Sequence, residues 1–516
     1  MSKSAKKIKP PKGTRDLYPE DVLRQRYITN AWRDASIRCG FEEIAGPTFE
    51  STDLYAVKSG DGILGELFQA FSGKSEREIE KVKSTGQAEY ALRPEFTPTL
   101  ARMYAAKSKE LPKPCKWFTA GPYFRAERPQ RGRLREFLQW NVDVIGLPGE
   151  EATPESKAQM DSEIIGCCLS AFGNLGLKSE GVTQDLSLHI NDRNAAASGL
   201  MSIGIHPSKI DAAFEIIDRL EKIGKREPER EIEMLGQEIL SFFTMWNGAT
   251  EALNGDQNTS SFKPYLEAQK AVDALAAQSE LTTPIFNTAY FGSLLLLLKQ
   301  LDLHGYGRQS CFDAGIVRGL AYYTGTVFEA LADGERAVAG GGRYDNLIEL
   351  FGGPPTPACG FGMGDVVLSN LLDDKALMPE GLELMEAVAR PQASIRPEAF
   401  VVPNGDENNE SLVHTLTANL RRGIESESWL ADENRKPWNA DRYAVAPLHA
   451  RISYKSTRKT NKPRDDAMKQ HAKFFVVINA QDNAELTNLD TRETIGTFST
   501  DPSEENYIGR AIADHL

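Results

Sequence analysis

The chain has 516 residues, which is too long for one compact core, so two to four domains are expected. Its 41% hydrophobic content, 27 prolines and 42 glycines are ordinary for a globular protein and exclude a largely disordered chain. The formal net charge of -13 argues against a protein that coats nucleic acid without specificity. A local basic groove could still bind RNA within an acidic whole.

The cysteines and the N-terminus bear on the compartment. Six cysteines are scattered through the chain, with no C-x-x-C pair and no histidine cluster, so we expect neither a metal site nor a disulfide framework. The basic segment MSKSAKKIKPPKG is followed by no apolar stretch, which argues against a secretory signal. The longest apolar run, residues 294–298, is too short to cross a bilayer. A soluble, cytoplasmic protein without membrane contact is expected.

The first part of the chain mixes helix and strand signals. An amphipathic helix is expected over residues 21–39. Residues 41–50 read as a strand interrupted at Pro47. Short β-like runs separated by turns follow between residues 84 and 147. A second helix is expected over residues 156–172.

The composition then changes. Residues 205–280 are dense in helix formers, which predicts a helical insertion. Strand character returns at residues 311–330 and 335–364, and a polar stretch around 377–396 reads as a linker. Beyond it, EAFVVPNG, a helix near 412–422 and KFFVVINA predict a small α/β domain with a mainly parallel or mixed sheet.

An arginine-rich segment, FRAERPQRGRLREFLQW, lies between two strand-like stretches, with Pro129 and Gly132 marking the turn. It holds five arginines and no lysine, which favours planar, bidentate contact with phosphate. The flanking aromatic residues, among them Phe137, could stack on a purine base. On these residues alone, a solvated hairpin loop remains the competing interpretation.

Two further segments carry polar, aromatic or glycine-rich patterns. RGLAYYTGTVFEA (318–330) places an arginine before two tyrosines, and AGGGRYDNL (339–347) would let a backbone or a ligand approach closely. Taken singly, each could be an ordinary strand edge or turn. Other phosphate-binding patterns fail, because Phe68 occupies the first glycine position of a Walker A loop and Asp365 the last glycine position of a dinucleotide fingerprint.

Taken in order, RPEFTPTLARMYA, FRAERPQRGRLREFLQ, RGLAYYTGTVFEA and GGGRYDNL resemble the motifs of the histidyl-tRNA synthetase family. The resemblance implies an α+β fold: a class II synthetase antiparallel catalytic sheet with a helical insertion, plus a C-terminal α/β anticodon-binding domain. It also implies a homodimer whose interface includes GFEEIAGPTFE. The implied domains are a catalytic core over 1–196 and 281–376, a helical insertion over 197–280, a linker over 377–396 and an anticodon-binding domain over 397–516.

The activity that this resemblance implies is that of an aminoacyl-tRNA ligase. Such a protein activates L-histidine with ATP, with Mg²⁺ on the ATP phosphates, and transfers the histidyl group to the 3′ end of tRNA(His). Two alternatives from other classes stay open: a histidine-binding regulatory subunit of a biosynthetic phosphoribosyltransferase, and a catalytically impaired tRNA sensor.

The resemblance also implies individual roles. The residues expected to bind histidine are Glu95, Thr97, Gln139, Asp143, Tyr322 and Tyr323. Those expected to bind ATP are Arg125, Arg133, Phe137 and Arg318. Of these, Arg125 and Arg318 are expected to be catalytic, because they would stabilise charge at the α-phosphate.

Contacts with tRNA are expected in two places. The resemblance places the acceptor end near Gln130. In the last domain, RISYKSTRKTNKPR is basic without any acid, so it is the leading candidate for contact with an anticodon loop. Its candidate phosphate contacts are Arg451, Lys455, Arg458 and Lys459, and Tyr454 could add base stacking.

The chain departs from the family pattern at Val367, where relatives usually carry an arginine that contacts the γ-phosphate. Another cation, Arg133 or Arg343, is therefore expected to take that contact. Asp143 stands where the family usually has Glu, and Ala321 where many relatives have Asp.

Overall fold

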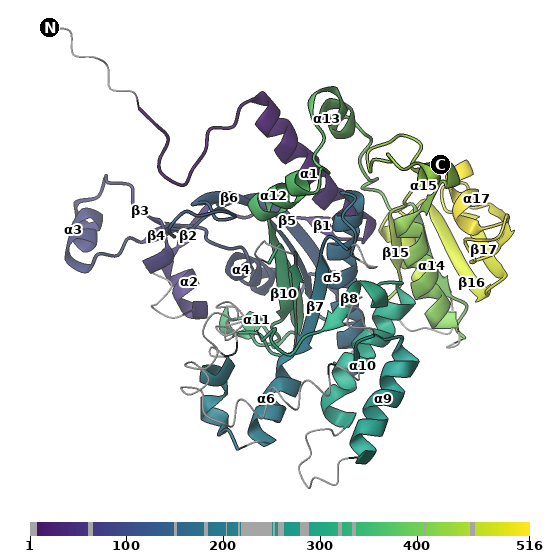
Figure 1. The fold of residues 1–516 in the computed structure, drawn as a ribbon, viewed down its shortest axis with the longest axis horizontal. Helices are drawn as coiled ribbons and strands as arrows, with labels where there is room; N and C mark the ends of the chain where they lie inside the picture. The colour runs from purple at the N-terminus through teal and green to yellow at the C-terminus, as the bar shows by residue number, and fades with distance from the viewer. Residues whose placement is uncertain are drawn as a thin grey trace.

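The computed structural model describes residues 8–59, 65–148, 152–179, 184–202, 204–214, 217, 250, 253–255, 263–278, 288–317, 322–332, 337–406, 409–454 and 460–516. These residues form an eight-stranded sheet and a five-stranded sheet, each with helices packed on it, and two smaller sheets (Figure 1). Within this described part, no helix is both long and apolar enough to cross a membrane.

The eight-stranded sheet is the larger framework. Its strands run in the order β1 (Glu42–Glu43), β5 (Cys115–Phe124), β6 (Glu136–Ile145), β11 (Ala358–Gly364), β10 (Ala339–Arg343), β9 (Thr326–Leu331), β7 (Ser187–Asp192) and β8 (Ser310–Phe312). Neighbouring strands are antiparallel except at the two edges, where β1 pairs with β5 and β7 with β8 in parallel. The expected antiparallel sheet is therefore mixed, with one parallel strand added at each edge.

Helices α1 (Pro19–Arg38) and α5 (Pro154–Asn174) confirm the two helices expected in the first part of the chain. Proline at the first position of each helix and the Thr153 hydroxyl, which accepts from the Ser156 backbone N–H, explain where they begin. The helix α5 runs past Gly173, which was expected to lie beyond its end. The core below them is tightly packed, with Trp32 of α1 stacked on Trp140 of β6 at 6.0 Å between ring centroids.

The other elements of this part surround the sheet. Beside it lie the small sheet β2 (Phe49–Ser51), β4 (Tyr90–Leu92) and β3 (Gln69–Ala70), and the helices α2 (Thr52–Ser59), α3 (Glu76–Thr85), α4 (Thr97–Lys107) and α11 (Leu347–Leu350). The break between β1 and β2 confirms the strand interrupted at Pro47. Figure 1 shows α3 with β2, β3 and β4 projecting to one side of the large sheet.

The helical insertion falls largely outside the described residues. Its described parts are helical: α6 (Arg193–Ser202), the short 3-10 helix η2 (Pro207–Lys209) and α9 (Tyr265–Gln278). They are followed by α10 (Thr288–Leu303), which packs on α5, and by η4 (Gly307–Gln309).

The segment expected to be a linker has structure of its own. It follows α12 (Asp365–Asp374) and contains α13 (Gly381–Val388), which packs on α1. Leu384 and Ala387 of α13 are buried in the core of the large sheet. Residues 377–396 are thus attached to the first body and do not simply connect it to the next.

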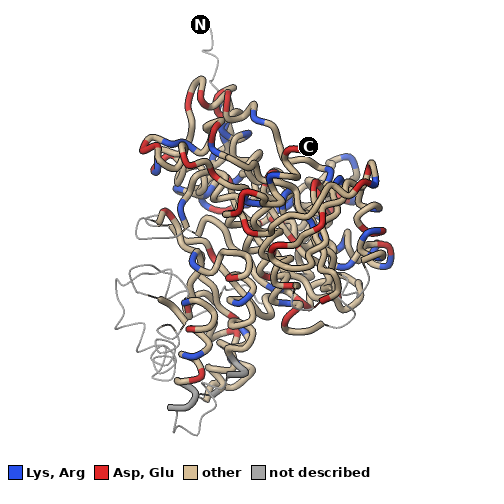
Figure 2. The backbone as a smooth tube through the Cα atoms, turned by 90° about the vertical axis from the view of Figure 1, so that its right-hand side faces the viewer, with Lys and Arg blue, Asp and Glu red and all other residues tan. Residues whose placement is uncertain are grey.

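The five-stranded sheet confirms the mixed sheet expected near the C-terminus. Its order is β15 (Ala450–Ile452), β12 (Ala399–Pro403), β16 (Phe474–Ala480), β17 (Asn483–Asn488) and β18 (Thr494–Phe498), parallel across the first three strands and antiparallel across the last three. It is accompanied by α14 (Glu410–Arg422), α15 (Glu427–Ala431), α16 (Asn461–Lys469), α17 (Ile508–Asp514) and the pair β13 (Ile424–Glu425) and β14 (Tyr443–Val445). Acidic and basic residues are interspersed along the described part of the chain (Figure 2).

A buried ionic contact joins the two bodies. Glu163 of α5, 1% exposed in its side chain, accepts from Lys116 Nζ of β5 at 2.8 Å and from Arg421 Nη1 of α14 at 3.0 Å. Nearby, His304 Nε2 lies 3.3 Å from His414 Nδ1 of α14. Because removing one partner of a buried ion pair leaves an uncompensated charge, these contacts hold α14 to the large sheet in a defined orientation.

The buried histidines make stability depend on pH. Burial and the neighbouring His414 lower the pKa of His304 to about 3. Burial and Arg451 likewise lower the pKa of His449 to about 3. In the unfolded chain both would titrate near about 6.5, so the unfolded state binds more protons below that pH. We expect the free energy of unfolding to fall from about pH 6.5 towards pH 3, by up to about 1.4 kcal/mol per pH unit for each histidine.

Chemical denaturation between pH 7.5 and 5 measures this slope. The variant His304→Gln should reduce it, because a neutral side chain binds no proton in either state. The matched control His515→Gln changes an exposed histidine near the C-terminus and should leave the slope unaltered. An unchanged slope in His304→Gln would contradict the assignment.

Candidate functional site

The arginine-rich segment forms the turn of the β5–β6 hairpin. Gln130 and Arg133 exchange backbone hydrogen bonds of 3.1 and 2.9 Å, and Gly132 between them has φ of 75°, a conformation that favours glycine. The long, in-register pairing of the two strands, with Tyr123 opposite Phe137, holds the turn over the sheet. The sequence prediction of a hairpin here is confirmed.

The arginines of this hairpin separate into different environments. Arg125 and Arg133 line a cavity of about 900 Å³ over the sheet, together with Glu127. Glu127 is shared between them, 2.5 Å from Arg133 Nη1 and 3.8 Å from Arg125 Nη1. By contrast, Arg131 is paired with Asp374 at 2.8 Å, and Arg135 donates to the Glu127 carbonyl. Two of the arginines are therefore placed to meet a ligand in the cavity.

Phe137 lines the same end of the cavity. The guanidinium carbon of Arg125 lies 5.3 Å from the centroid of its ring. The Nε of Arg125 also donates to the Pro94 carbonyl at 3.1 Å, which fixes the direction of the side chain. A flat apolar face beside a fixed cation is a suitable surface for a base that carries phosphates.

The floor of the cavity is made by glycines. Gly340 of β10 and Gly360, Gly362 and Gly364 of β11 all line it. A Cβ at Gly360 would lie 2.2 Å from Asp143 Oδ1, and one at Gly362 would lie 2.4 Å from Gln139 Nε2. Residues two apart on a strand face the same side, so the bare face of β11 leaves room for the side chains of β6.

The β6 side chains that fill this room are polar. Gln139, Asn141 and Asp143 alternate along the strand and all line the cavity. Gln139 Nε2 donates to Asn141 Oδ1 at 3.1 Å, whereas its buried Oε1 has no hydrogen-bond partner among the described residues. Since a buried polar atom is normally paired, this acceptor is suited to a donor group of a ligand.

Asp143 is held by a tyrosine that sequence reasoning did not single out. The Tyr344 hydroxyl donates to Asp143 Oδ1, and both residues are almost fully buried. Burial, and then the Asp143 carboxylate, raise the pKa of Tyr344 well above its usual value, so its hydroxyl remains a donor. Tyr344 itself lines the cavity directly after β10.

The remaining predicted histidine-binding residues also reach this cavity. Glu95 and Thr97, at the start of α4, line it, as do Tyr322 and Tyr323, whose rings lie 4.5 Å apart.

Of the other predicted site residues, Arg318 and Ala321 lie outside the described residues. Val367 lines the cavity beside Val366, at the start of α12. Gln130 is exposed at the hairpin turn and does not itself line the cavity, whereas Gly132 and Arg133 of the same turn do.

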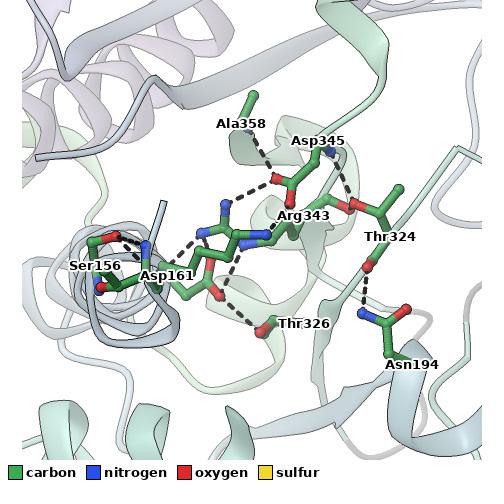
Figure 3. A network of polar contacts seen from close by, with 10 residues as sticks. Ser156, Asp161, Asn194, Thr324, Thr326, Arg343, Asp345 and Ala358 are labelled. Carbon is green, nitrogen blue, oxygen red and sulfur yellow. Dashed lines mark hydrogen bonds and ion pairs between the residues drawn. The ribbon is translucent and has the colours of Figure 1, made fainter. Parts of the chain in front are cut away.

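Arg343 is committed to a structural network and is not available to a phosphate (Figure 3). Its side chain is 3% exposed and donates to Asp161 at 2.6 Å, to Asp345 at 3.0 Å and to the Lys157 carbonyl at 2.9 Å. Figure 3 shows Thr326 also directed at Asp161. The expectation that Arg343 could replace the arginine missing at position 367 is therefore wrong, because its charge is already neutralised.

The basic segment near the C-terminus is only partly described. Lys455, Arg458 and Lys459 lie outside the described residues. Arg451 is mostly buried, with Nε donating to His449 Nε2 at 3.0 Å and Nη1 donating to Gln470 at 2.8 Å. Tyr454 receives a hydrogen bond of 3.1 Å from Lys116 Nζ and packs against the cores of both bodies. Arg451 and Tyr454 are thus used where the two bodies meet, and their contact with RNA stays a prediction.

Several cavity residues were missed by the sequence reasoning, namely Glu127, Asn141, Glu329 and Tyr344. The alternation along β6 could have found Asn141, which lies between two predicted residues. Tyr344 follows the glycine strand directly, but no local signal shows that its hydroxyl meets a residue 201 positions away.

Comparisons with known proteins place this geometry in a class. The crystal structure of histidyl-tRNA synthetase from Nostoc sp. PCC 7120 has a TM-score of 0.52 and 21% sequence identity, and the match covers 99% of this chain and 100% of that one. Its likeness shows the fold, which is that of a class II aminoacyl-tRNA synthetase.

Sequence comparison is more specific. A family model described as histidyl-tRNA synthetase matches residues 13–365. Histidine–tRNA ligase of Opitutus terrae is 37% identical over 372 residues, 71% of this chain and 75% of that protein. Histidine–tRNA ligase of Thermococcus kodakarensis is 32% identical over 425 residues, 82% of this chain and 84% of that protein. The chain belongs to the histidyl-tRNA synthetase family.

The glycine floor predicts a position-specific loss of stability. In Gly360→Ala, the new methyl group would meet the Asp143 carboxylate and, at 2.7 Å, the Val142 carbonyl, which cannot move away. We expect the free energy of unfolding to fall by about 1–3 kcal/mol, as for other overpacked sites. The matched control is Gly173→Ala in α5, where a Cβ would meet nothing within 4 Å. That control should be neutral or stabilising by up to about 1 kcal/mol. Equal urea midpoints for the two variants would count against the close approach.

Proposed function

We propose that this protein is a histidine–tRNA ligase, which activates L-histidine with ATP and transfers it to the 3′ end of tRNA(His). The supporting observation is that one cavity has two chemically different ends. Arg125, Arg133 and Phe137 form a cationic and aromatic end, and a set of carboxylate, amide and phenol groups forms the other. ATP suits the first end and a free amino acid the second.

At the ATP end, Phe137 would stack on adenine and Arg125 would contact the α-phosphate. Arg125 has its Nε on a backbone carbonyl and its Nη1 3.8 Å from Glu127, so its remaining N–H groups can donate to phosphate oxygens. Arg133 is the described cation that lines the cavity beside it, and we propose that it contacts the γ-phosphate in place of the arginine absent at Val367. The resemblance adds Arg318 as the second cation at the α-phosphate.

At the amino acid end, Glu95, Thr97 and the unpartnered Oε1 of Gln139 would accept hydrogen bonds from the α-ammonium group. Asp143 and Tyr323 would contact the two imidazole nitrogens, one as acceptor and one as a phenol. Pairing both nitrogens rejects amino acids that lack them, because the buried groups of the site would otherwise be left unpaired. Tyr322 packs on Tyr323 and would complete this wall.

The chemistry follows from this placement. A carboxylate oxygen of histidine attacks the α-phosphorus, the bond to the bridging oxygen breaks, and pyrophosphate leaves. A ribose hydroxyl of the terminal nucleotide of tRNA then attacks the carbonyl carbon of the adenylate, and AMP leaves. Fixed cations at the α-phosphate stabilise the charge that develops in the first step, and positioning supplies much of the rest.

Magnesium would enter with ATP as part of the substrate. Within the described residues, no group of three His, Cys, Asp or Glu side chains is arranged to hold a metal ion. Mg²⁺ keeps several waters and is usually bound by substrate phosphates with one or two carboxylates. Glu127, which lies beside Arg125 and Arg133, is the carboxylate that could help hold it near the phosphates.

The remaining partners are proposed from the family and from surface features. Gln130, exposed on the hairpin, would meet the acceptor end of tRNA, and Lys455, Arg458 and Lys459 would contact its anticodon region. A homodimer is supported by Phe49, which is 56% exposed on β2 within the segment GFEEIAGPTFE. Light scattering of the purified chain distinguishes one copy from two.

A cytoplasmic location is supported by six buried, free thiols, which persist in a reducing compartment.

The direct test is histidine-dependent exchange of pyrophosphate into ATP, followed by charging of tRNA(His). Both steps should proceed with the purified protein. Histidine binding without exchange would overturn the proposal in favour of a regulatory subunit. Binding of tRNA alone would indicate a sensor, which the valine at position 367 makes the relevant alternative.

The Tyr344–Asp143 contact predicts a selective effect on histidine. In Tyr344→Phe the ring remains but the donor to Asp143 is lost, so the carboxylate is less well oriented towards imidazole. We expect the KM for histidine in the exchange assay to rise by about tenfold, as for loss of a hydrogen bond to a charged group, with the KM for ATP changed less than twofold.

The control is Tyr90→Phe, which removes a hydroxyl on β4 that lies outside the cavity lining and should change neither constant. Parallel increases of both KM values in Tyr344→Phe would show a general disturbance of the cavity and would exclude the selective role.

A further inference from the structure

The segment before α1 crosses the outside of the arginine-rich hairpin. The Gly13 carbonyl accepts from the Arg135 backbone N–H at 2.7 Å. Gly13 has φ of 88°, and a Cβ there would lie 2.6 Å from Cγ of Pro129. Only glycine fits this conformation and this close approach without strain, so the segment is packed directly on the base of the hairpin.

Two residues further on, Arg15 meets a buried carboxylate. Asp365, 2% exposed, is the first residue of α12 and accepts from Arg15 Nη2. The same carboxylate accepts from the Leu138 backbone N–H of β6 at 2.9 Å and from Gln25 Nε2 of α1 at 3.3 Å. Asp365 thus ties together the N-terminal segment, the first helix, β6 and α12.

The carboxylate lies at the joint between two walls of the cavity. Leu138 is flanked on β6 by Phe137 and Gln139, which both line the cavity. Asp365 is followed on α12 by Val366 and Val367, which line it as well. A buried carboxylate that lacked its cation would become protonated or would move towards solvent. Either change would alter how the start of α12 packs against β6 at Leu138.

Position 367 carries valine, so α12 has no arginine side chain with which to hold ATP from the cavity side. Arg15 contacts the same helix at its first residue, Asp365, and neither residue lines the cavity. The Arg15 side chain is 35% exposed and does not line the cavity, so its influence on a ligand must pass through Asp365 and the β6 backbone.

We propose that Arg15 is a positioning residue for the ATP end of the cavity, acting through Asp365 to hold Phe137 of β6 and the start of α12 in register. This inference rests on the proposed function for the identity of the ligand. It predicts that loss of the Arg15 charge weakens ATP binding and leaves histidine binding nearly unchanged, because the histidine-contacting residues Gln139 and Asp143 are held by their own contacts with Asn141 and Tyr344.

The test uses the full chain with Arg15→Met, Arg15→Lys and the matched control Arg24→Met. Arg24 pairs with Asp373, at the other end of α12, with 2.5 Å between Nη2 and Oδ1, but this pair is exposed and touches neither the hairpin nor the cavity. In the exchange assay, Arg15→Met should raise the KM for ATP by about tenfold and the KM for histidine by less than twofold. Arg15→Lys should recover part of the loss, and Arg24→Met should behave as the wild type.

A second measurement does not depend on catalysis. ATP should raise the thermal unfolding midpoint of the wild type and of Arg24→Met, since a ligand that binds the native state stabilises it. The same ATP concentration should raise the midpoint of Arg15→Met much less. If ATP stabilises the wild type but no exchange occurs, the ligase proposal fails while the role of Arg15 can still be judged. If ATP does not stabilise the wild type, the proposed function itself fails at its first step.

The double variant Arg15→Met/Asp365→Asn supplies the sharpest outcome. An amide keeps an acceptor for the Leu138 N–H but needs no cation, so ATP binding should partly recover relative to Arg15→Met alone. The single variant Asp365→Asn completes the comparison. If the losses of ATP binding in Arg15→Met and Asp365→Asn add up in the double variant, the proposal is overturned. An unchanged KM for ATP in Arg15→Met with a lowered unfolding midpoint would likewise leave Arg15 a purely structural residue.

Discussion

The cavity depends on the absence of side chains from one face of β10 and β11. A methyl group at Gly360 or Gly362 would occupy the positions now taken by Asp143 Oδ1 and Gln139 Nε2. Sheets normally bury or solvate a continuous layer of side chains on each face, so a cavity in the middle of a sheet requires this gap. Because β11 pairs directly with β6, the gap lies beside the polar residues of β6 and lets them converge on one space.

Buried charges then fix the elements around this gap. Arg343 and Asp161 join the end of β10 to α5, Arg15 and Asp365 join the N-terminal segment to α12, and Glu163 joins α5 and β5 to α14. Buried ion pairs add little net stability, because desolvation offsets most of their attraction. Their effect is on arrangement, since each charge is costly in any packing that separates it from its partner. The three sites therefore specify how helices that are distant in the sequence meet the sheet.

Local signals were enough to predict much of the fold, but not the partner of each charge. The helix starts, the strand broken at Pro47, the hairpin and the C-terminal βαβ pattern all rest on residues close together in the chain. Motif resemblance brought Glu95, Gln139 and Asp143 into one site, and all three line the cavity. The error at Arg343 concerns a cation whose partner is remote. Arg343 was assigned to a ligand because a sequence shows a charge and its neighbours, whereas a carboxylate 182 residues away neutralises it.

The strand β5 connects the two parts of the molecule that a nucleic acid would have to reach. Near its start, Lys116 is held by Glu163 and by Tyr454 of the C-terminal body. At its end, Phe124 leads into the arginine-rich hairpin. Ten extended residues span roughly 33 Å, and a strand paired within a sheet cannot change that length. The spacing between the cavity and the docking point of the C-terminal body is thus set by one rigid strand. Tyr454 and Arg451 serve this docking through their contacts with Lys116 and Glu42 of the first body.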